Sequence, residues 1–131
     1  MRPVSGFVDF CERVCAVRLT PGQHVAAIVA VDGVEPSDLT GSDRDLARKL
    51  FGGVDKVPSP AKGVVLLLKG ARVGGSYIFG GLYSLWRALT ANLSSLAPGE
   101  QATALVVAPD TRLGRQVLRY GENPHQRAAV Y

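Results

Sequence analysis

Apolar residues in the first third of the chain recur at the spacing of amphipathic helices. Between Ser5 and Val17 they fall three and four positions apart, which predicts a helix capped by its first residue. Thr20-Pro21 then has the sequence of a helix start, a capping residue followed by proline at the first helical position. This second helix is expected to run to about Val31, although its Val and Ile content also permits a strand. A third, short helix is expected to be capped by Ser42 and to stop at Gly52-Gly53.

The pattern changes in the second half of the chain. Gly63–Leu68 is a continuous aliphatic run, which is typical of a strand buried on both faces of a parallel sheet. The glycine-rich turn Gly70–Gly75 leads into a helix-length segment from Ser76 to about Ala91. A second aliphatic run, Ala102–Ala108, precedes another helical pattern over Asp110–Tyr120. This order predicts an α/β fold, in which a helical N-terminal segment is followed by a parallel β-α-β-α unit.

These patterns divide the chain into a helical segment over residues 1–60, the β-α-β-α unit over 61–120 and a polar tail over 121–131. The length of 131 residues, with 47% apolar and 20% charged residues, fits a globular chain. The longest apolar run, Val64–Leu68, is far below the roughly 20 residues that cross a bilayer, and the first eight residues lack a signal-peptide pattern. We therefore expect a soluble, cytoplasmic chain without a membrane partner.

Charge and cysteine content add candidate chemistry. Fifteen Lys and Arg against eleven Asp and Glu give a net charge of +4, which suits a polyanionic partner. Arg112, Arg115 and Arg119 share one face of the last predicted helix, where they either track DNA phosphates or form an ordinary solvated surface. Cys11 and Cys15 lie four residues apart without a second pair of ligands, which indicates buried free thiols instead of a zinc site.

The turn from Lys69 to Ser76 lies where phosphate-binding loops are found, between an apolar run and a helix start. Glycines there allow backbone N–H groups to surround a phosphate, and the helix start adds partial positive charge. In the standard pattern G-x-x-x-x-G-K-[ST] a lysine precedes the hydroxyl residue. Gly75 holds that position here, and Lys69 stands at the head of the loop instead. An ordinary strand-to-helix turn with surface cations is the alternative interpretation.

The residues of this turn resemble the deviant Walker A loop of viral (phage) large terminase subunits, the ATPases that drive DNA into capsids. The matching positions are Lys69, Ala71, Arg72, Val73, Gly74 and Ser76. Two flanking segments resemble the same family, with Leu19–Gln23 similar to its adenine motif and Leu105–Asp110 similar to its next strand and turn. The resemblance covers residues from about 7 to 119 and implies the N-terminal part of a terminase ATPase domain, with an incomplete P-loop-type unit.

The resemblance also implies roles for individual residues, with ATP and Mg²⁺ as cofactors. Lys69 and Arg72 would contact the phosphates, Ser76 would bind Mg²⁺, and Gln23 would read adenine. The phosphate cradle would be shaped by Gly70, Gly74 and Gly75. The implied partners are a nucleotide, double-stranded DNA, further copies of the chain and other terminase subunits. No Asp-Glu pair follows Val107 to serve as Walker B acid and catalytic glutamate, so we expect nucleotide binding without hydrolysis by this chain alone.

The tail carries a second resemblance. Leu118–Gln126 is very similar to a signature of the bifunctional purine-biosynthesis enzyme that joins AICAR transformylase to IMP cyclohydrolase. In that family the Arg-Tyr pair, here Arg119 and Tyr120, belongs to a ribonucleotide-binding region. The match covers about the last fourteen residues, and a catalytic site needs groups from several distant segments. The hypotheses are therefore an ATP-binding front fragment of a terminase-like motor, which we prefer, a remnant of the purine enzyme, and a non-catalytic interaction protein.

Overall fold

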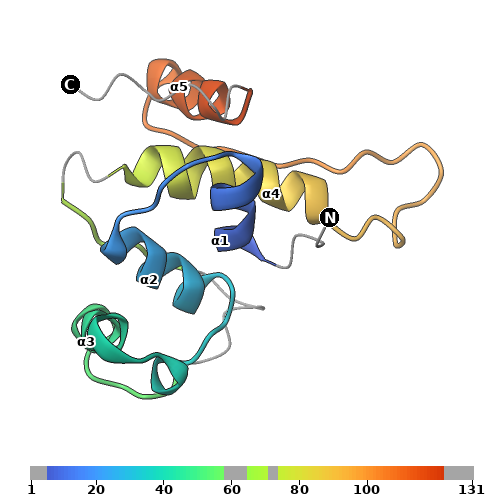
Figure 1. Ribbon diagram of the computed structural model, residues 1–131. Coiled ribbons are helices and arrows are strands. Elements are labelled where there is room, and N and C mark those ends of the chain that lie inside the picture. The colour runs from blue at the N-terminus through green and yellow to red at the C-terminus, as the bar shows by residue number, and fades with distance from the viewer. Residues whose placement is uncertain (1–5, 58–64, 71–73, 123–131) are drawn as a thin grey trace. The chain divides into compact units, whose positions relative to one another are not determined.

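The computed structural model describes residues 6–57, 65–70 and 74–122, and the chain divides into two compact units, Met1–Leu68 and Lys69–Tyr131. Every regular element in these described ranges is helical (Figure 1). The predicted boundary after residue 60 falls within residues 58–64, outside the described residues, and stays a prediction. The two units are described separately below.

The first unit begins with a short helix, as the apolar spacing predicts. α1 (Phe7–Asp9) continues directly into the π-helical turn η1 (Phe10–Val14). The helix ends before Ala16, whose φ of 52° lies in the left-handed region that closes many helices. Its predicted cap, Ser5, lies outside the described residues. The side chains that recur at helical spacing and are buried are those of Phe7, Phe10, Cys11 and Cys15.

α2 (Pro21–Ala30) starts with the predicted capping signal and is a helix, not a strand. The Thr20 hydroxyl accepts a 3.3 Å hydrogen bond from the Gln23 backbone N–H, and Gln23 Oε1 accepts a 3.0 Å bond from the Thr20 N–H. This reciprocal pair is a capping box, which satisfies two N–H groups that the helix start leaves free. The sequence Thr20-Pro21-Gly22-Gln23 therefore fixes the start of α2 by local chemistry alone.

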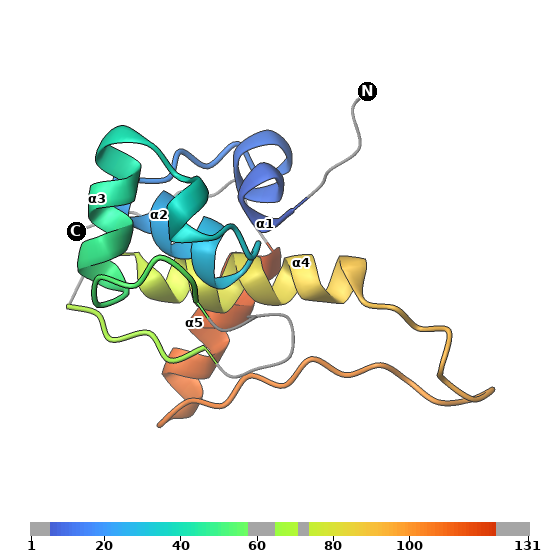
Figure 2. The same ribbon diagram turned by 90° about the horizontal axis from the view of Figure 1, so that it is seen from below.

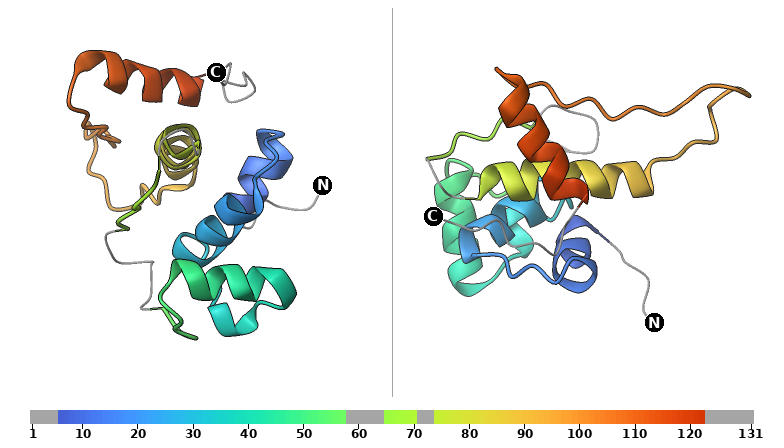
Figure 3. Two further views of the ribbon diagram at one scale, coloured as in Figure 1. Left: turned by 90° about the vertical axis from the view of Figure 1, so that its left-hand side faces the viewer. Right: turned by 90° about the horizontal axis from the view of Figure 1, so that it is seen from above.

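The turn η2 (Pro36–Asp38) leads to α3 (Gly41–Leu50), whose N-cap residue is Thr40 and not the predicted Ser42. The predicted stop is confirmed, because Gly52 and Gly53 have φ of 72° and 81° just after the helix. α2 and α3 pack together in this unit (Figure 3), with Val25, Val29 and Ala47 no more than 1% exposed. The partly buried side chains around this cluster are Ile28, Leu39, Leu46, Phe51 and Val57.

In the second unit, η4 (Ser76–Leu82) and α4 (Tyr83–Thr90) form one continuous helix, and α5 (Thr111–Glu122) crosses it (Figure 3). Both helices confirm predicted helical segments. A glycine pair allows the close crossing. A Cβ on Gly80 would lie 3.2 Å from Val117 Cγ1, and a Cβ on Gly81 would overlap Tyr120 and lie 3.3 Å from the Val117 carbonyl oxygen. The Tyr120 ring also meets the edge of the Tyr77 ring, with centroids 5.2 Å apart.

The predicted α/β fold is wrong for the described residues, which contain no strand and therefore no parallel β-α-β-α unit. Residues 65–68 and 102–108 are extended but pair with no other described segment, and the second run belongs to the long connection between α4 and α5 (Figure 2). Leu66 and Leu68 are 82% and 88% exposed, and Leu105 and Val107 are each 83% exposed. An aliphatic run becomes a strand only when neighbours satisfy its backbone and cover its faces, and no described segment does so for these runs.

Candidate functional site

The turn between Lys69 and Ser76 leads into the helix formed by η4 and α4. Gly74 has a φ of 73°, a left-handed conformation that glycine adopts without steric cost. Its carbonyl oxygen accepts a 2.9 Å hydrogen bond from the Ile78 N–H, so Gly74 closes the first turn of the helix. The backbone at this position therefore requires glycine for a reason that is independent of any ligand.

The Lys69 side chain lies across Gly75 at the start of this helix. A Cβ built on Gly75 would lie 2.6 Å from Lys69 Cε and 3.6 Å from Lys69 Nζ. The lysine stem thus occupies the space that a side chain at position 75 would fill. The Gly75 backbone is helical, with φ −60° and ψ −40°, and would accept any ordinary residue. The backbone conformation therefore does not require glycine at position 75; the absence of a Cβ leaves room for the Lys69 side chain.

Two sources of positive potential meet at this turn. A helix start leaves its first N–H groups without intrahelical acceptors and carries a partial positive charge. The Lys69 ammonium group adds a full charge beside it, and no described carboxylate forms an ion pair with this ammonium. Lys69, Gly74 and Ser76 are exposed, so an anion can reach the turn from solvent. This combination fits a phosphate group, and the exposed hydroxyl of Ser76, the first residue of η4, could join a phosphate-bound Mg²⁺.

The structure brings together some of the predicted site residues. Lys69, Gly75 and Ser76 meet at the helix start, with the exposed Gly70 next to the lysine. Arg72 lies outside the described residues, so its phosphate contact stays a prediction. Gln23 belongs to the other unit, where its side chain caps α2. Its role in reading adenine likewise stays a prediction.

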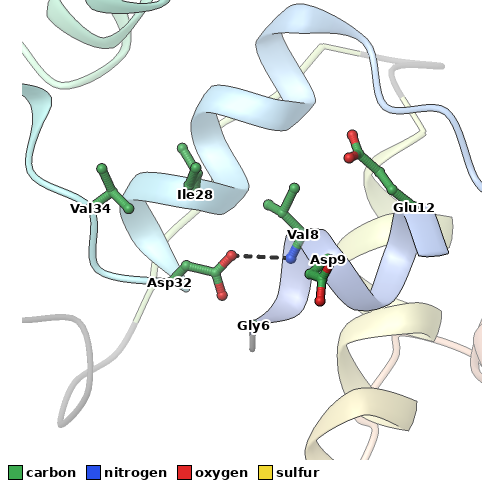
Figure 4. A pocket seen from close by; sticks show the side chains of 7 residues that line it. All are labelled: Gly6, Val8, Asp9, Glu12, Ile28, Asp32 and Val34. Carbon is green, nitrogen blue, oxygen red and sulfur yellow. Dashed lines mark hydrogen bonds between the residues drawn. The ribbon is translucent and has the colours of Figure 1, made fainter. Parts of the chain in front are cut away.

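A pocket in the first unit was not predicted from the sequence (Figure 4). It has a volume of about 370 Å³. Asp32 forms part of its wall and caps α1, because its carboxylate accepts hydrogen bonds of 2.6 Å from the Phe7 N–H and 3.1 Å from the Val8 N–H. Asp32-Gly33 has only the local signature of a chain break, and a contact 25 residues back along the chain leaves no short-range signal. The pocket is lined by Gly6, Val8, Asp9, Glu12, Ile28, Asp32 and Val34.

The carboxylates of this pocket already have structural partners. Asp9 pairs with Arg13 at 2.8 Å, and Glu12 lies 3.6 Å from His24 Nδ1. The Asp32 carboxylate accepts hydrogen bonds from two backbone N–H groups. No cluster of three potential metal ligands occurs within the described ranges. Each carboxylate that lines the pocket therefore has a partner within the first unit, and that of Asp32 links α1 to the end of α2.

Cys11 and Cys15 are buried and free, which confirms the prediction of buried thiols. Burial, and to a lesser extent the nearby charges of Cys15, Asp32 and Glu12, together raise the pKa of Cys11 to about 12. Burial also raises the pKa of Cys15. Because the thiolate is the nucleophilic form, neither cysteine is a candidate nucleophile at neutral pH.

Comparisons with known proteins add no relative. No protein-family model, no curated protein and no solved structure matches the chain. Among the helices in the part of the chain that the structure describes, none is both long enough and apolar enough to cross a membrane.

Proposed function

We propose that this chain binds a nucleotide through its phosphates at the turn from Lys69 to Ser76, as the front part of a terminase-like DNA-packaging ATPase. The observation that carries the proposal is the Lys69 side chain, which lies across the glycine at the start of a helix. From this place a lysine could reach the β- and γ-phosphates of a bound nucleotide, which is the role that the terminase resemblance implies for it. The free thiols Cys11 and Cys15 are in keeping with action in the reducing cytoplasm.

The proposal rests on the turn and the helix start, and not on a parallel sheet. A phosphate between the Lys69 ammonium and the first N–H groups would receive charge-assisted hydrogen bonds from both sides. Ser76 is the first residue of η4 and is exposed, so Mg²⁺ bound to that phosphate could use its hydroxyl as a ligand. Asp110 and Glu122, the only acidic residues after Val107, do not form an Asp-Glu pair, so we expect binding without turnover.

The test is calorimetric titration of the full chain with ATP, with inorganic tripolyphosphate and with adenosine. ATP and tripolyphosphate are expected to bind and adenosine is not, because the turn recognises phosphate. Lys69→Ala should weaken both interactions at least about tenfold, since a charge-assisted hydrogen bond contributes roughly 1.5–3 kcal/mol. Lys56→Ala is the matched control, because Lys56 is an exposed lysine of the other unit.

Absence of ATP binding by the unaltered chain would overturn the proposal. Equal weakening by Lys69→Ala and Lys56→Ala would also overturn it, because the effect would then reflect net charge. Release of phosphate from ATP by the purified chain would contradict only the expectation of binding without turnover.

The role of Gln23 can be tested without breaking its cap. Gln23→Glu keeps a side-chain oxygen that can accept the Thr20 N–H and removes the amide donor that adenine would need. If Gln23 reads adenine, this substitution should weaken ATP binding several-fold and leave tripolyphosphate binding unchanged. Equal affinity of the variant and the unaltered chain for ATP would remove Gln23 from the site.

A second candidate function, a non-catalytic interaction protein, is favoured by the exposed aliphatic side chains of the extended segments. Leu66 and Leu105 are both more than four-fifths exposed, at 82% and 83%. Such side chains are candidates for contact with another protein surface. Light scattering coupled to size-exclusion chromatography tests self-association directly, and the double substitution Leu66→Ser and Leu105→Ser should then shift the chain to the monomer. A monomer at all accessible concentrations would argue against self-association.

A further inference from the structure

The arginines of α5 differ from most other arginines of the described chain, of which only Arg18 is likewise exposed and without a described partner. Arg13 pairs with Asp9 at 2.8 Å, Arg44 and Arg48 lie 3.8 Å and 3.6 Å from Asp55, and Arg87 lies 6.0 Å from the Trp86 ring. The α5 arginines have no ion pair or hydrogen bond to any described residue, and all are exposed. They are Arg112, Arg115 and Arg119.

These arginines share the face of α5 that is turned away from the helix it crosses. At 3.6 residues per turn they fall within an arc of about 60° and span about 10 Å along the axis. The opposite face is occupied, since Val117 and Tyr120 contact Gly80 and Gly81. Glu122 is the one acidic residue of α5, and it lies beyond Arg119 in the last turn. The helix therefore presents a row of unpaired guanidinium groups on a surface that its own packing leaves free.

We propose that this arginine row, Arg112, Arg115 and Arg119, binds the phosphate backbone of a nucleic-acid duplex without reading its sequence. Three free cations along one rigid helix match a regular array of phosphates, and Arg binds phosphate through a planar pair of donors. The inference deepens the proposed function and rests on it for the biological role of the contact. The contact itself needs no bound nucleotide.

Features of α5 favour a duplex over other polyanions. Binding of a single strand depends on aromatic side chains that stack on unpaired bases, and the tyrosine of α5, Tyr120, is already packed against Tyr77 and hydrogen-bonded to Gln116 at 2.7 Å. A helix that binds a membrane surface inserts its apolar stripe into the lipid. On α5 that stripe includes Val117, which already contacts Gly80.

The experiment measures binding of the full chain to a fluorescent 30-base-pair DNA duplex by anisotropy, without nucleotide and at several salt concentrations. Changing Arg112, Arg115 and Arg119 together to Gln should weaken binding at least about tenfold. It should also reduce the magnitude of the negative slope of log K against log salt by about 3, because each phosphate contact contributes roughly 0.9 to that magnitude. The matched control changes Arg13, Arg18 and Arg48 to Gln, which removes the same number of charges from exposed arginines of the other unit.

The corresponding triple Lys variant loses the planar donor pair but keeps the charge that neutralises a phosphate, so it should bind more tightly than the triple Gln variant and keep the salt dependence of the unaltered chain. Equal losses in the control and α5 variants would overturn the proposal, because any reduction of net charge would then suffice. Equal or tighter binding of a single strand of the same length, or of vesicles with 30% phosphatidylserine, would overturn the choice of a duplex. Because the duplex assay contains no nucleotide, it is independent of the ATP titration. The proposal of duplex binding can therefore be overturned while the proposal of nucleotide binding stands, and the reverse.

Discussion

The Asp32 carboxylate accepts a 2.6 Å hydrogen bond from the backbone N–H of Phe7, which lies 25 residues earlier in the chain. Asp32 follows the end of α2, and Phe7 is the first residue of α1. The bond therefore fixes the start of one helix to the end of another. Gly6 makes room for it, since a Cβ at position 6 would lie 2.7 Å from Asp32 Oδ1.

Removing this cap should destabilise the first unit. Asp32→Ala leaves the Phe7 and Val8 N–H groups without their acceptor and should lower the free energy of unfolding by about 1–2 kcal/mol. Asp32→Asn keeps one acceptor oxygen and should cost less. Urea denaturation followed by circular dichroism measures the difference. Asp38→Ala, at an exposed position of the same unit, is the control and should stay within about 0.5 kcal/mol of the unaltered chain; an equal loss in both variants would contradict the role of Asp32.

Gly75→Ala should separate stability from phosphate binding. Its helical backbone accepts alanine, which favours the helix by roughly 0.5–1 kcal/mol over glycine. The new Cβ would lie 2.6 Å from Lys69 Cε and must displace the lysine side chain. Thermal denaturation should therefore show equal or higher stability, while titration with tripolyphosphate shows several-fold weaker binding. Unchanged binding would mean that the position of Lys69 over Gly75 is irrelevant to the site.

Gly81→Ala should loosen the crossing of α5 with the preceding helix. The added Cβ would overlap Tyr120 and lie 3.3 Å from the Val117 carbonyl, so α5 must move at a cost of about 1–3 kcal/mol. Hydrogen exchange should show faster opening of α5 amides. Gly22→Ala is the control, because a Cβ there meets nothing within 4 Å. Slow exchange in both variants would show that the crossing tolerates a side chain.

Stability should fall between pH 9 and pH 12 because of Cys11. The thiol pKa is raised from 9.0 to about 12 by burial in the folded chain, so the unfolded chain loses its proton first as the pH rises. The unfolded state then binds fewer protons than the folded state, and the free energy of unfolding decreases with pH over this interval. Below pH 9 the contribution is constant. Urea midpoints from pH 7 to 10.5 should fall more steeply for the unaltered chain than for Cys11→Ala. An equal fall of the midpoint with pH in both chains would show that Cys11 does not cause the loss of stability.

Structural features that depend on contacts between neighbouring residues could be predicted from the sequence. Features that depend on contacts between distant residues could not. Thr20 and Gln23 form their capping box within four residues, so the start of α2 is visible in the sequence. The aliphatic runs around Leu66 and Leu105 were predicted as strands because hydrophobicity alone cannot show whether another segment pairs with them. Gly75 was predicted as the last residue of a turn, whereas its backbone is helical, and its contact with the Lys69 stem depends on a chain conformation that no periodicity predicts.

The exposed aliphatic side chains have a thermodynamic consequence. Leu66, Leu68, Leu105 and Val107 are each more than 80% exposed, and burial of one such side chain contributes about 1.5–3 kcal/mol. Together they represent a reserve of roughly 6–12 kcal/mol, which is similar to the total stability of a small domain. A partner surface that covers the two side chains of one extended segment, Leu66 and Leu68 or Leu105 and Val107, would gain about 3–6 kcal/mol and could therefore change the conformation of that segment.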